Sequence, residues 1–175
     1  MKINLKYKTM KKLFWILLLG VIMGCNTTSA PSEPETFTEM PWTKMDKVEE
    51  LVKKNPKKIL VDVYTPWCGP CKMMDRMTFN DPAVINKVGK NFYPVKFNAE
   101  GPDSFTFMGK EYSNPNYNPA KAKTRNSKHQ LSNFFAVRGY PTMVVLDENM
   151  NIIDKIVGFQ KPDQLIASLA KYDSK

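Results

Sequence analysis

Two cysteines three residues apart are the side chains in this sequence best placed to do chemistry. Cys68 and Cys71 enclose a Gly-Pro pair. They follow an apolar, β-branched run at residues 59–63, which is typical of a strand buried on both faces. Residues 72–77 then resume as a predicted helix. Cys68 is therefore expected where a strand ends and a helix begins, with Cys71 one helical turn further on.

That position favours a reactive thiolate. A helix N-terminus presents unpaired N–H groups and about half a positive charge. The pKa of Cys68 should therefore fall below the free value of about 8.5. The thiolate is the species that attacks disulfides, and Pro70 suits a first helical turn, where a missing N–H costs little. The spacing predicts a two-cysteine redox switch with Cys68 reachable from solvent.

Zinc binding and a purely structural disulfide are the other uses of such a pair. A structural zinc site usually needs four Cys or His ligands, and beyond this pair the chain offers only Cys25 and His129. The redox use is therefore favoured. His129 is expected on a helix surface and not as a base, because nothing in the sequence places it near Cys68.

Three segments resemble the thioredoxins. Residues 61–63 with Trp67-Cys68-Gly69-Pro70-Cys71 resemble that family's active-site segment, including Asp62 six positions before the first cysteine. Residues 138–142 (Arg-Gly-Tyr-Pro-Thr) resemble its loop with a cis proline. Residues 96–98 (Lys-Phe-Asn) resemble its third strand, where a lysine lies near the buried acid. The resemblance covers roughly residues 43–172, with one insertion.

The resemblance implies roles for the acid and the lysine. Asp62 would be buried behind the cysteines, so that desolvation raises its pKa and it accepts the proton of Cys71. The alternative is a strand-end acid that serves packing or solubility. Lys96 would hydrogen-bond Asp62 and tune it, or would be only a surface lysine.

The resemblance also implies a substrate surface. Trp67 would offer an apolar contact, and a cis Pro141 would expose the backbone of Tyr140 to an extended substrate peptide. Gly69 and Pro70 resemble the reducing thioredoxins, near −270 mV. Residues 78–84 resemble the periplasmic thioredoxin-like domain of membrane thiol-reductant transporters, which favours a reductive protein of the cell envelope.

The expected fold is α/β: the thioredoxin fold, with a central mixed sheet of four or five strands and helices on both faces, in the order αβαβαββα. The domain is assigned to residues 37–175. A weak strand is expected at 36–40 and a helix from Thr43, whose spacing to Asp46 resembles a capping box. The insertion at 101–127 is expected to be a surface excursion with a little helix, or else a cover for substrate beside the active site.

The N-terminal residues have the pattern of a targeting signal. Lysines precede an apolar core at 13–23, which at eleven residues is shorter than the roughly twenty of a membrane span. The core ends in Ile-Met-Gly-Cys, which resembles the lipobox of bacterial lipoproteins. Residues 1–24 are therefore predicted to be a lipoprotein signal peptide, with a lipid on Cys25 and a flexible tether at 25–36. The alternatives are type I signal cleavage near this site and a short anchor that is not cleaved.

The charge excludes a nucleic-acid footprint. The chain has a net charge of +9, but residues 1–24 hold five lysines and no acid, which leaves 21 basic and 17 acidic residues and a net charge of +4. That is an ordinary surface, and a basic patch for an acidic partner is the alternative.

These observations predict an envelope thiol:disulfide oxidoreductase that reduces substrate proteins by dithiol exchange. Its expected partners are exported proteins with disulfides, a transmembrane thiol donor and the membrane. It is expected to be a periplasm-facing monomer with no cofactor, no metal and no nucleic acid. A soft-metal (copper) chaperone and a peptide-binding module with an inert disulfide are the alternatives.

Overall fold

The computed structural model describes residues 36–173. The predicted signal peptide at 1–24, the lipid site at Cys25 and all but the end of the tether lie outside the described residues. The helices are η1 (Met45–Lys47), α1 (Val48–Lys54), α2 (Gly69–Met73), the π-helix η2 (Met74–Thr78), α3 (Pro82–Asn91), η3 (Pro119–Lys121), α4 (Gln130–Phe134), α5 (Pro162–Leu169) and η4 (Ala170–Tyr172). The strands are β1 (Lys58–Tyr64), β2 (Phe92–Asn98), β3 (Phe105–Phe107), β4 (Lys110–Tyr112), β5 (Thr142–Leu146) and β6 (Ile152–Val157).

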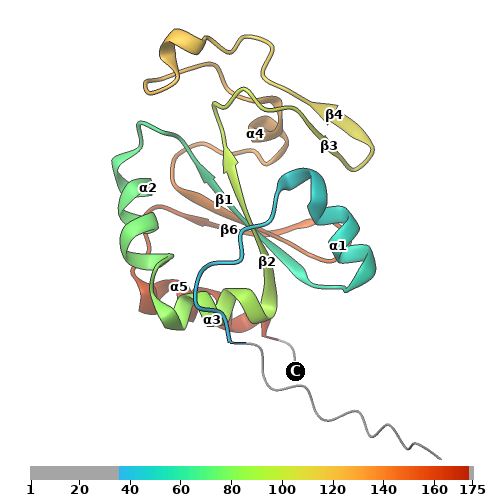
Figure 1. The fold of residues 1–175 in the computed structure, drawn as a ribbon, viewed down its shortest axis with the longest axis vertical. Coiled ribbons are helices and arrows are strands. Elements are labelled where there is room, and N and C mark those ends of the chain that lie inside the picture. Colours follow the sequence, from blue (N-terminus) through green and yellow to red (C-terminus); the bar gives the residue numbers. More distant parts are fainter. Residues whose placement is uncertain (1–35, 174–175) are drawn as a thin grey trace, which may run out of the picture. The chain divides into compact units, whose positions relative to one another are not determined.

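The central sheet is mixed and has four strands in the order β2-β1-β5-β6. β1 pairs parallel with β2, so that Asp62 lies opposite Lys96, and antiparallel with β5. β5 and β6 form the predicted antiparallel hairpin. Pro94 lies on the edge strand β2, where a missing backbone donor is tolerated. The thioredoxin layout expected from the sequence is confirmed (Figure 1).

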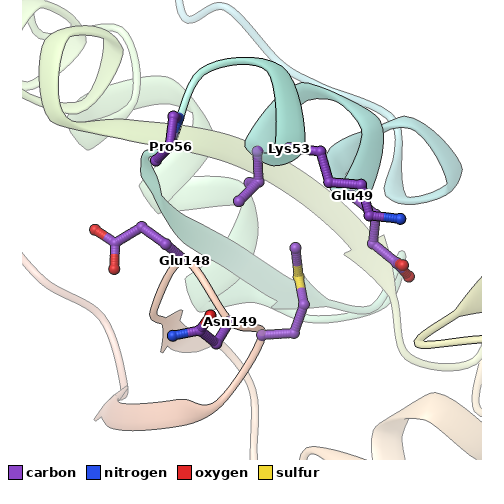
Figure 2. Close-up of a pocket in the computed structure, with 7 residues that line it drawn as sticks. Glu49, Lys53, Pro56, Glu148 and Asn149 are labelled. Atoms are coloured by element: carbon purple, nitrogen blue, oxygen red, sulfur yellow. The ribbon is translucent and has the colours of Figure 1, made fainter.

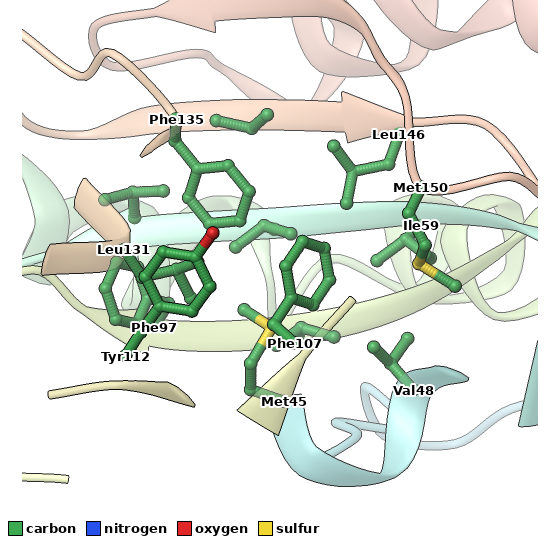
Figure 3. Close-up of a cluster of buried hydrophobic side chains, with 14 of the residues drawn as sticks. Met45, Val48, Ile59, Phe97, Phe107, Tyr112, Leu131, Phe135, Leu146 and Met150 are labelled. Carbon is green, nitrogen blue, oxygen red and sulfur yellow. The ribbon is translucent and has the colours of Figure 1, made fainter. Parts of the chain in front are cut away.

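Each face of the sheet has its own hydrophobic core, because β1 is buried on both sides. One core, shown in Figure 3, combines alternate β1 side chains with α1, α4 and the β3–β4 hairpin. The other packs Leu60 of β1 against η2, α3 and α5. Asp62 alternates in phase with Leu60, so it points to the face that the active-site helix covers.

The start of the domain differs from the prediction. Residues 36–40 form no strand. Thr43 does not cap a helix: it is extended, bridges to Val95, and donates its N–H to the Pro94 carbonyl at 2.7 Å. The first helix begins at Met45, after Lys44, without a side-chain cap. The backbone N–H of Thr43 is bonded to a carbonyl on the edge strand β2. This hydrogen bond between distant segments outweighs the local capping pattern.

The insertion is only in part the surface excursion with a little helix that was expected, because residues 118–125 are exposed and hold η3 but other parts are buried. It contains the antiparallel hairpin β3–β4, and Phe107 is completely buried in the core of Figure 3, beside Tyr112. Its remainder, which includes η3, runs over the end of the sheet where β1 leads into α2 (Figure 1). The insertion is therefore part of the folded domain.

The sequence pair Asp81-Pro82 is typical of a helix start. The Asp81 carboxylate caps α3 by accepting from the N–H groups of Ala83 and Val84 at 2.9 and 3.1 Å, and Pro82 occupies the first turn. Within residues 36–173, no helix is long and apolar enough to span a membrane.

Candidate active site

Cys68 and Cys71 form a disulfide at the start of α2. Cys68 is the N-cap residue of α2, and its Sγ accepts the backbone N–H of Cys71 at 3.1 Å. Pro70 lies in the first turn, as predicted. The sulfur of Cys68 thus lies where the N–H groups of a helix point, and this arrangement can hold a thiolate once the disulfide is reduced.

The two cysteines are less accessible than the sequence suggested. Each is only 3% exposed in the disulfide form, so the expectation that Cys68 is freely reachable is wrong for this state. Gly69 and Pro70, between them, are exposed. Gly69 and Pro70 are therefore the solvent-facing residues of the Cys-x-x-Cys segment.

Asp62 is a buried acid behind the active-site helix. The residue is 2% exposed, and its Oδ1 has no hydrogen-bond partner among the described residues. Burial raises the pKa of Asp62 to about 7, with Lys96 opposing the rise and Asp75 adding to it. An acid with that pKa can give and take protons near neutrality.

Lys96 reaches Asp62 but binds another acid more closely. Its Nζ lies 3.9 Å from Asp62 Oδ2 and forms a shorter ion pair and hydrogen bond with Asp75, on η2. The same ammonium lies over the rings of Trp42 and Tyr64, at 5.2 and 5.0 Å from their centroids. Lys96 is therefore held in place and shared between two carboxylates.

Trp67 is fixed by three contacts. Its Nε1–H donates to Glu100 Oε2 at 2.8 Å, and its ring meets Tyr140 edge-on with centroids 5.9 Å apart. The guanidinium of Arg125 lies 4.6 Å from its ring centroid. The Glu100 oxygen that accepts from Trp67 also accepts the N–H of Asn126 at 2.8 Å. The insertion is thus attached directly to the residue that precedes Cys68.

The predicted cis-proline loop lies beside the cysteines. The Tyr140–Pro141 bond is cis, and the ring contact of Tyr140 with Trp67 brings this loop to the active site. The Tyr140 hydroxyl is buried and has no hydrogen-bond partner in the described part of the chain. Burial, with a contribution from the Glu100 charge, raises the pKa of Tyr140 to about 12.

His129 is not the surface residue that was expected. It is completely buried, and its Nδ1 caps α4 by accepting the N–H of Leu131 at 3.0 Å. Its Nε2 lies 2.8 Å from the carbonyl oxygen of Asp103. Burial lowers the pKa of His129. Both ring nitrogens have structural partners, which leaves neither for acid–base work.

Sequence reasoning missed three site residues: Asp75, Glu100 and Arg125. Asp75 is four residues after Cys71 on the same helical segment, and this spacing places it one turn further along. Glu100 and Arg125 gave no local signal, because their contacts with Trp67 exist only in the folded chain.

A hollow among the described residues lies away from the cysteines. Figure 2 shows it between Glu49 and Lys53 of α1 and Glu148 and Asn149 of the β5–β6 turn. Its Pro56 precedes β1, whereas Cys68 follows the other end of that strand. Among residues 36–173, no three His, Cys, Asp or Glu side chains come together to hold a metal ion.

The sheet topology, the disulfide at a helix start and the adjoining cis-proline loop define a thioredoxin-fold protein built for thiol:disulfide exchange. Residues 45–173 match the family model of the thioredoxin-like domain, and the chain belongs to that family. Thiol:disulfide oxidoreductase activity is the chemistry that this family and the Cys68–Cys71 pair support.

Curated relatives are similar over most of the chain. The thiol:disulfide interchange protein DsbD of Pectobacterium atrosepticum is 23% identical over an alignment of 168 positions, which covers 90% of this chain and 25% of that protein. The protein of the same name from Haemophilus ducreyi is 28% identical over an alignment of 182 positions, which covers 95% of this chain and 28% of that protein. The chain therefore spans about a quarter of the length of these relatives.

A solved structure confirms the fold. The structure described as DsbH Oxidoreductase superposes with a TM-score of 0.57 at 16% identity, covering 82% of this chain and 90% of that one. At this identity the likeness establishes the architecture alone.

Proposed function

We propose that this protein is a thiol:disulfide reductase of the bacterial cell envelope. The observation that supports it most directly is the placement of Cys68 as the N-cap of α2, bonded to Cys71 and beside the cis-proline loop. The DsbD relatives are named as thiol:disulfide interchange proteins, which agrees with this chemistry.

The reaction starts from the reduced form. The Cys68 thiolate attacks one sulfur of a substrate disulfide, forms a mixed disulfide and releases the other substrate sulfur as a thiolate. Cys71, once deprotonated, attacks the Cys68 sulfur and releases the second substrate sulfur. Two electrons have then moved to the substrate, and Cys68 and Cys71 form the disulfide that the structure contains.

Asp62 is the proposed acceptor of the Cys71 proton. Its pKa of about 7 lets it be ionised in a useful fraction of molecules at neutral pH. Lys96 stabilises the ionised form, while Asp75 engages the same ammonium and limits that help. Asp62 and Lys96 together are proposed to set the pH at which the attack of Cys71 on the Cys68 sulfur becomes fast.

The cis-proline loop and the aromatic pair are proposed to hold the substrate. The loop at Tyr140 and Pro141 leads directly into β5, so an extended peptide could pair with its backbone as an added strand. Trp67, half-buried and fixed against Tyr140, offers an apolar face next to the reacting sulfur. Cys68 is 3% exposed, but Gly69 and Pro70 beside it are exposed, so a substrate is proposed to approach from their side.

The N-terminus is proposed to place the domain outside the cytoplasm. Residues 1–24 would direct export and Cys25 would receive a lipid, with the tether at 25–36 joining the membrane to the domain. Disulfides form in that compartment, so a reductase there needs a transmembrane thiol donor to reduce its own disulfide after each turnover. The domain is further proposed to be monomeric, to face the periplasm and to act on exported proteins.

Reduction of insulin in the presence of dithiothreitol tests the catalysis. The protein should accelerate the reaction, and Cys68→Ser should abolish the acceleration. A Cys71→Ala variant, reduced and then freed of dithiothreitol before insulin is added, should accumulate mixed disulfides, which non-reducing gels detect. If the protein does not accelerate the reaction, it is a peptide-binding module or a metal chaperone, and the proposed function is wrong.

Equilibration with glutathione tests the direction. A reductase is expected near −270 mV, whereas strong oxidants lie near −120 mV. A value above about −150 mV would contradict the assignment as a reductase.

A further inference from the structure

We propose that residues 118–128, here called the basic loop, bind an acidic stretch of polypeptide next to the disulfide that Cys68 attacks. The inference deepens the proposed function and rests on it, because it assigns the class of substrate to the same site. Substrates would be disulfide proteins with Asp or Glu close to one of the bonded cysteines.

The basic loop touches the reacting end of the molecule. The Arg125 guanidinium lies over the Trp67 ring, 4.6 Å from its centroid, and the next residue, Asn126, donates its N–H to the same Glu100 oxygen that accepts from the Trp67 indole. Since Trp67 directly precedes Cys68, a ligand on Arg125 lies beside the attacked disulfide. Figure 1 shows this part of the insertion over the end of the sheet where β1 leads into α2.

The charge of the loop is one-sided. Lys121, Lys123, Arg125 and Lys128 are all exposed, and residues 118–128 contain no Asp or Glu. Within residues 36–173, none of these four cations forms an ion pair with a carboxylate. Glu100 offsets one charge, but it is 8% exposed and its Oε2 already accepts two N–H groups. The surplus positive charge faces solvent.

The loop is built to keep its shape. Asn118 donates its N–H to the Asn126 side chain at 3.0 Å, and the Asn126 amide donates back to the Asn118 carbonyl at 2.8 Å. Below them, the buried Asn114 donates to the carbonyls of Gly101 and Ser127. A loop tied at both ends loses little entropy when it binds, so its charges act as a fixed surface.

A carboxylate is the ligand that fits this chemistry. Arg125 is exposed and forms no ion pair among residues 36–173, so its guanidinium N–H groups can meet a carboxylate in pairs. The lysines add positive potential, which draws an anionic partner toward the site. An anionic lipid surface would also be attracted, but the position of Arg125 over the Trp67 ring places the charge next to the residue before Cys68, which favours a substrate.

Three matched peptides test the proposal. They share one intramolecular disulfide and carry two Glu, two Gln or two Lys beside it. The full chain, purified in a non-ionic detergent and reduced, is assayed for single-turnover reduction of each peptide. We expect the Glu peptide to be reduced about tenfold faster than the Gln peptide in about 0.01 M salt, with the Lys peptide slowest. The preference should shrink to less than about twofold in 1 M salt, where the Debye length is about 3 Å.

Variants separate the basic loop from general charge. Arg125→Gln and the double variant Lys121→Gln/Lys123→Gln should each reduce the preference for the Glu peptide at least threefold. Lys110→Gln removes one positive charge from β4 of the same insertion, where Lys110 lies over Tyr112, and should leave the preference intact. Thermal unfolding of each variant confirms that it is folded.

The outcomes are distinguishable. Equal rates for the three peptides, or a preference that the loop variants keep, would overturn the proposal and point to another anion, such as a lipid surface, while the reductase function stands. Failure to reduce any of the peptides would overturn the reductase function as well.

Discussion

Replacing Asp62 by Asn should make the folded protein more stable at high pH and slower as an enzyme. Asp62 is nearly fully buried, its Oδ1 has no hydrogen-bond partner in the described residues, and its pKa is raised from 3.8 to about 7. In the unfolded chain the same carboxyl ionises near 3.8. Between these two values the folded state holds a proton that the unfolded state has lost, so stability must fall as the pH rises.

The size of the effect follows from the two pKa values. With 3.8 unfolded and about 7 folded, the free energy of unfolding should fall by about 2.5 kcal/mol between pH 5 and pH 8. The total cost of ionising Asp62 well above pH 7 is about 4 kcal/mol. Asn has the same shape and no charge, so the variant should lack this pH dependence. Burying the Asn amide costs about 1–3 kcal/mol at every pH. This cost lowers the free energy of unfolding by the same amount throughout and does not change its pH dependence.

Urea unfolding of the oxidised full chain from pH 5 to pH 8 measures this difference. His129 also titrates, but its lowered pKa acts in the opposite direction and equally in both proteins, so it cancels in the comparison. Asp46→Asn, at an exposed helical position, is the matched control and should keep the wild-type slope. Parallel curves for wild type and Asp62→Asn would show that Asp62 titrates normally, and the role proposed for it as proton acceptor would then be wrong.

Three further variants probe the surroundings of the site. Lys96→Met removes the charge that lowers the pKa of Asp62. The rate of substrate release, measured against pH in single turnovers, should therefore reach half its maximum at a higher pH than in the wild type. A shift to lower pH would contradict this reasoning. Glu100→Ala removes the acceptor of two hydrogen bonds, one of them from Trp67, and should lower the unfolding free energy by about 2–3 kcal/mol, while Glu100→Gln should cost clearly less. Asp81→Ala should cost about 1 kcal/mol through loss of the α3 cap, measured by urea unfolding, whereas Asp81→Asn should be close to neutral.

The active-site segment could be predicted because its signals are local. The apolar run before Cys68, the Cys-x-x-Cys spacing and Pro70 each act within one strand or one turn, and the structure contains the strand, the helix start and the disulfide. The cap at Asp81 is local in the same sense. Nothing distant competes for these backbone groups.

Predictions failed where a distant partner decided the outcome. Thr43 has a capping pattern, yet its N–H goes to the carbonyl of Pro94 on an edge strand. His129 looked like a lone polar residue and is buried, because the Asp103 carbonyl and the N–H of Leu131 satisfy its two ring nitrogens. In each case a polar group that was expected to face solvent found a partner that only the folded chain provides.

The site is also larger than the Trp-Cys-Gly-Pro-Cys segment, since Glu100, just before the insertion, and Arg125, within it, both contribute. Glu100 and Arg125 are separated by most of that insertion, yet both contact Trp67, one at the indole nitrogen and one at the ring face. Trp67 is thereby held by both residues, and its ring also contacts that of Tyr140 edge-on. A cysteine pair alone specifies the reaction, but the groups that surround its entrance determine which disulfides arrive. That division explains why the chemistry could be predicted from a few residues, whereas substrate choice depends on contacts across the folded chain.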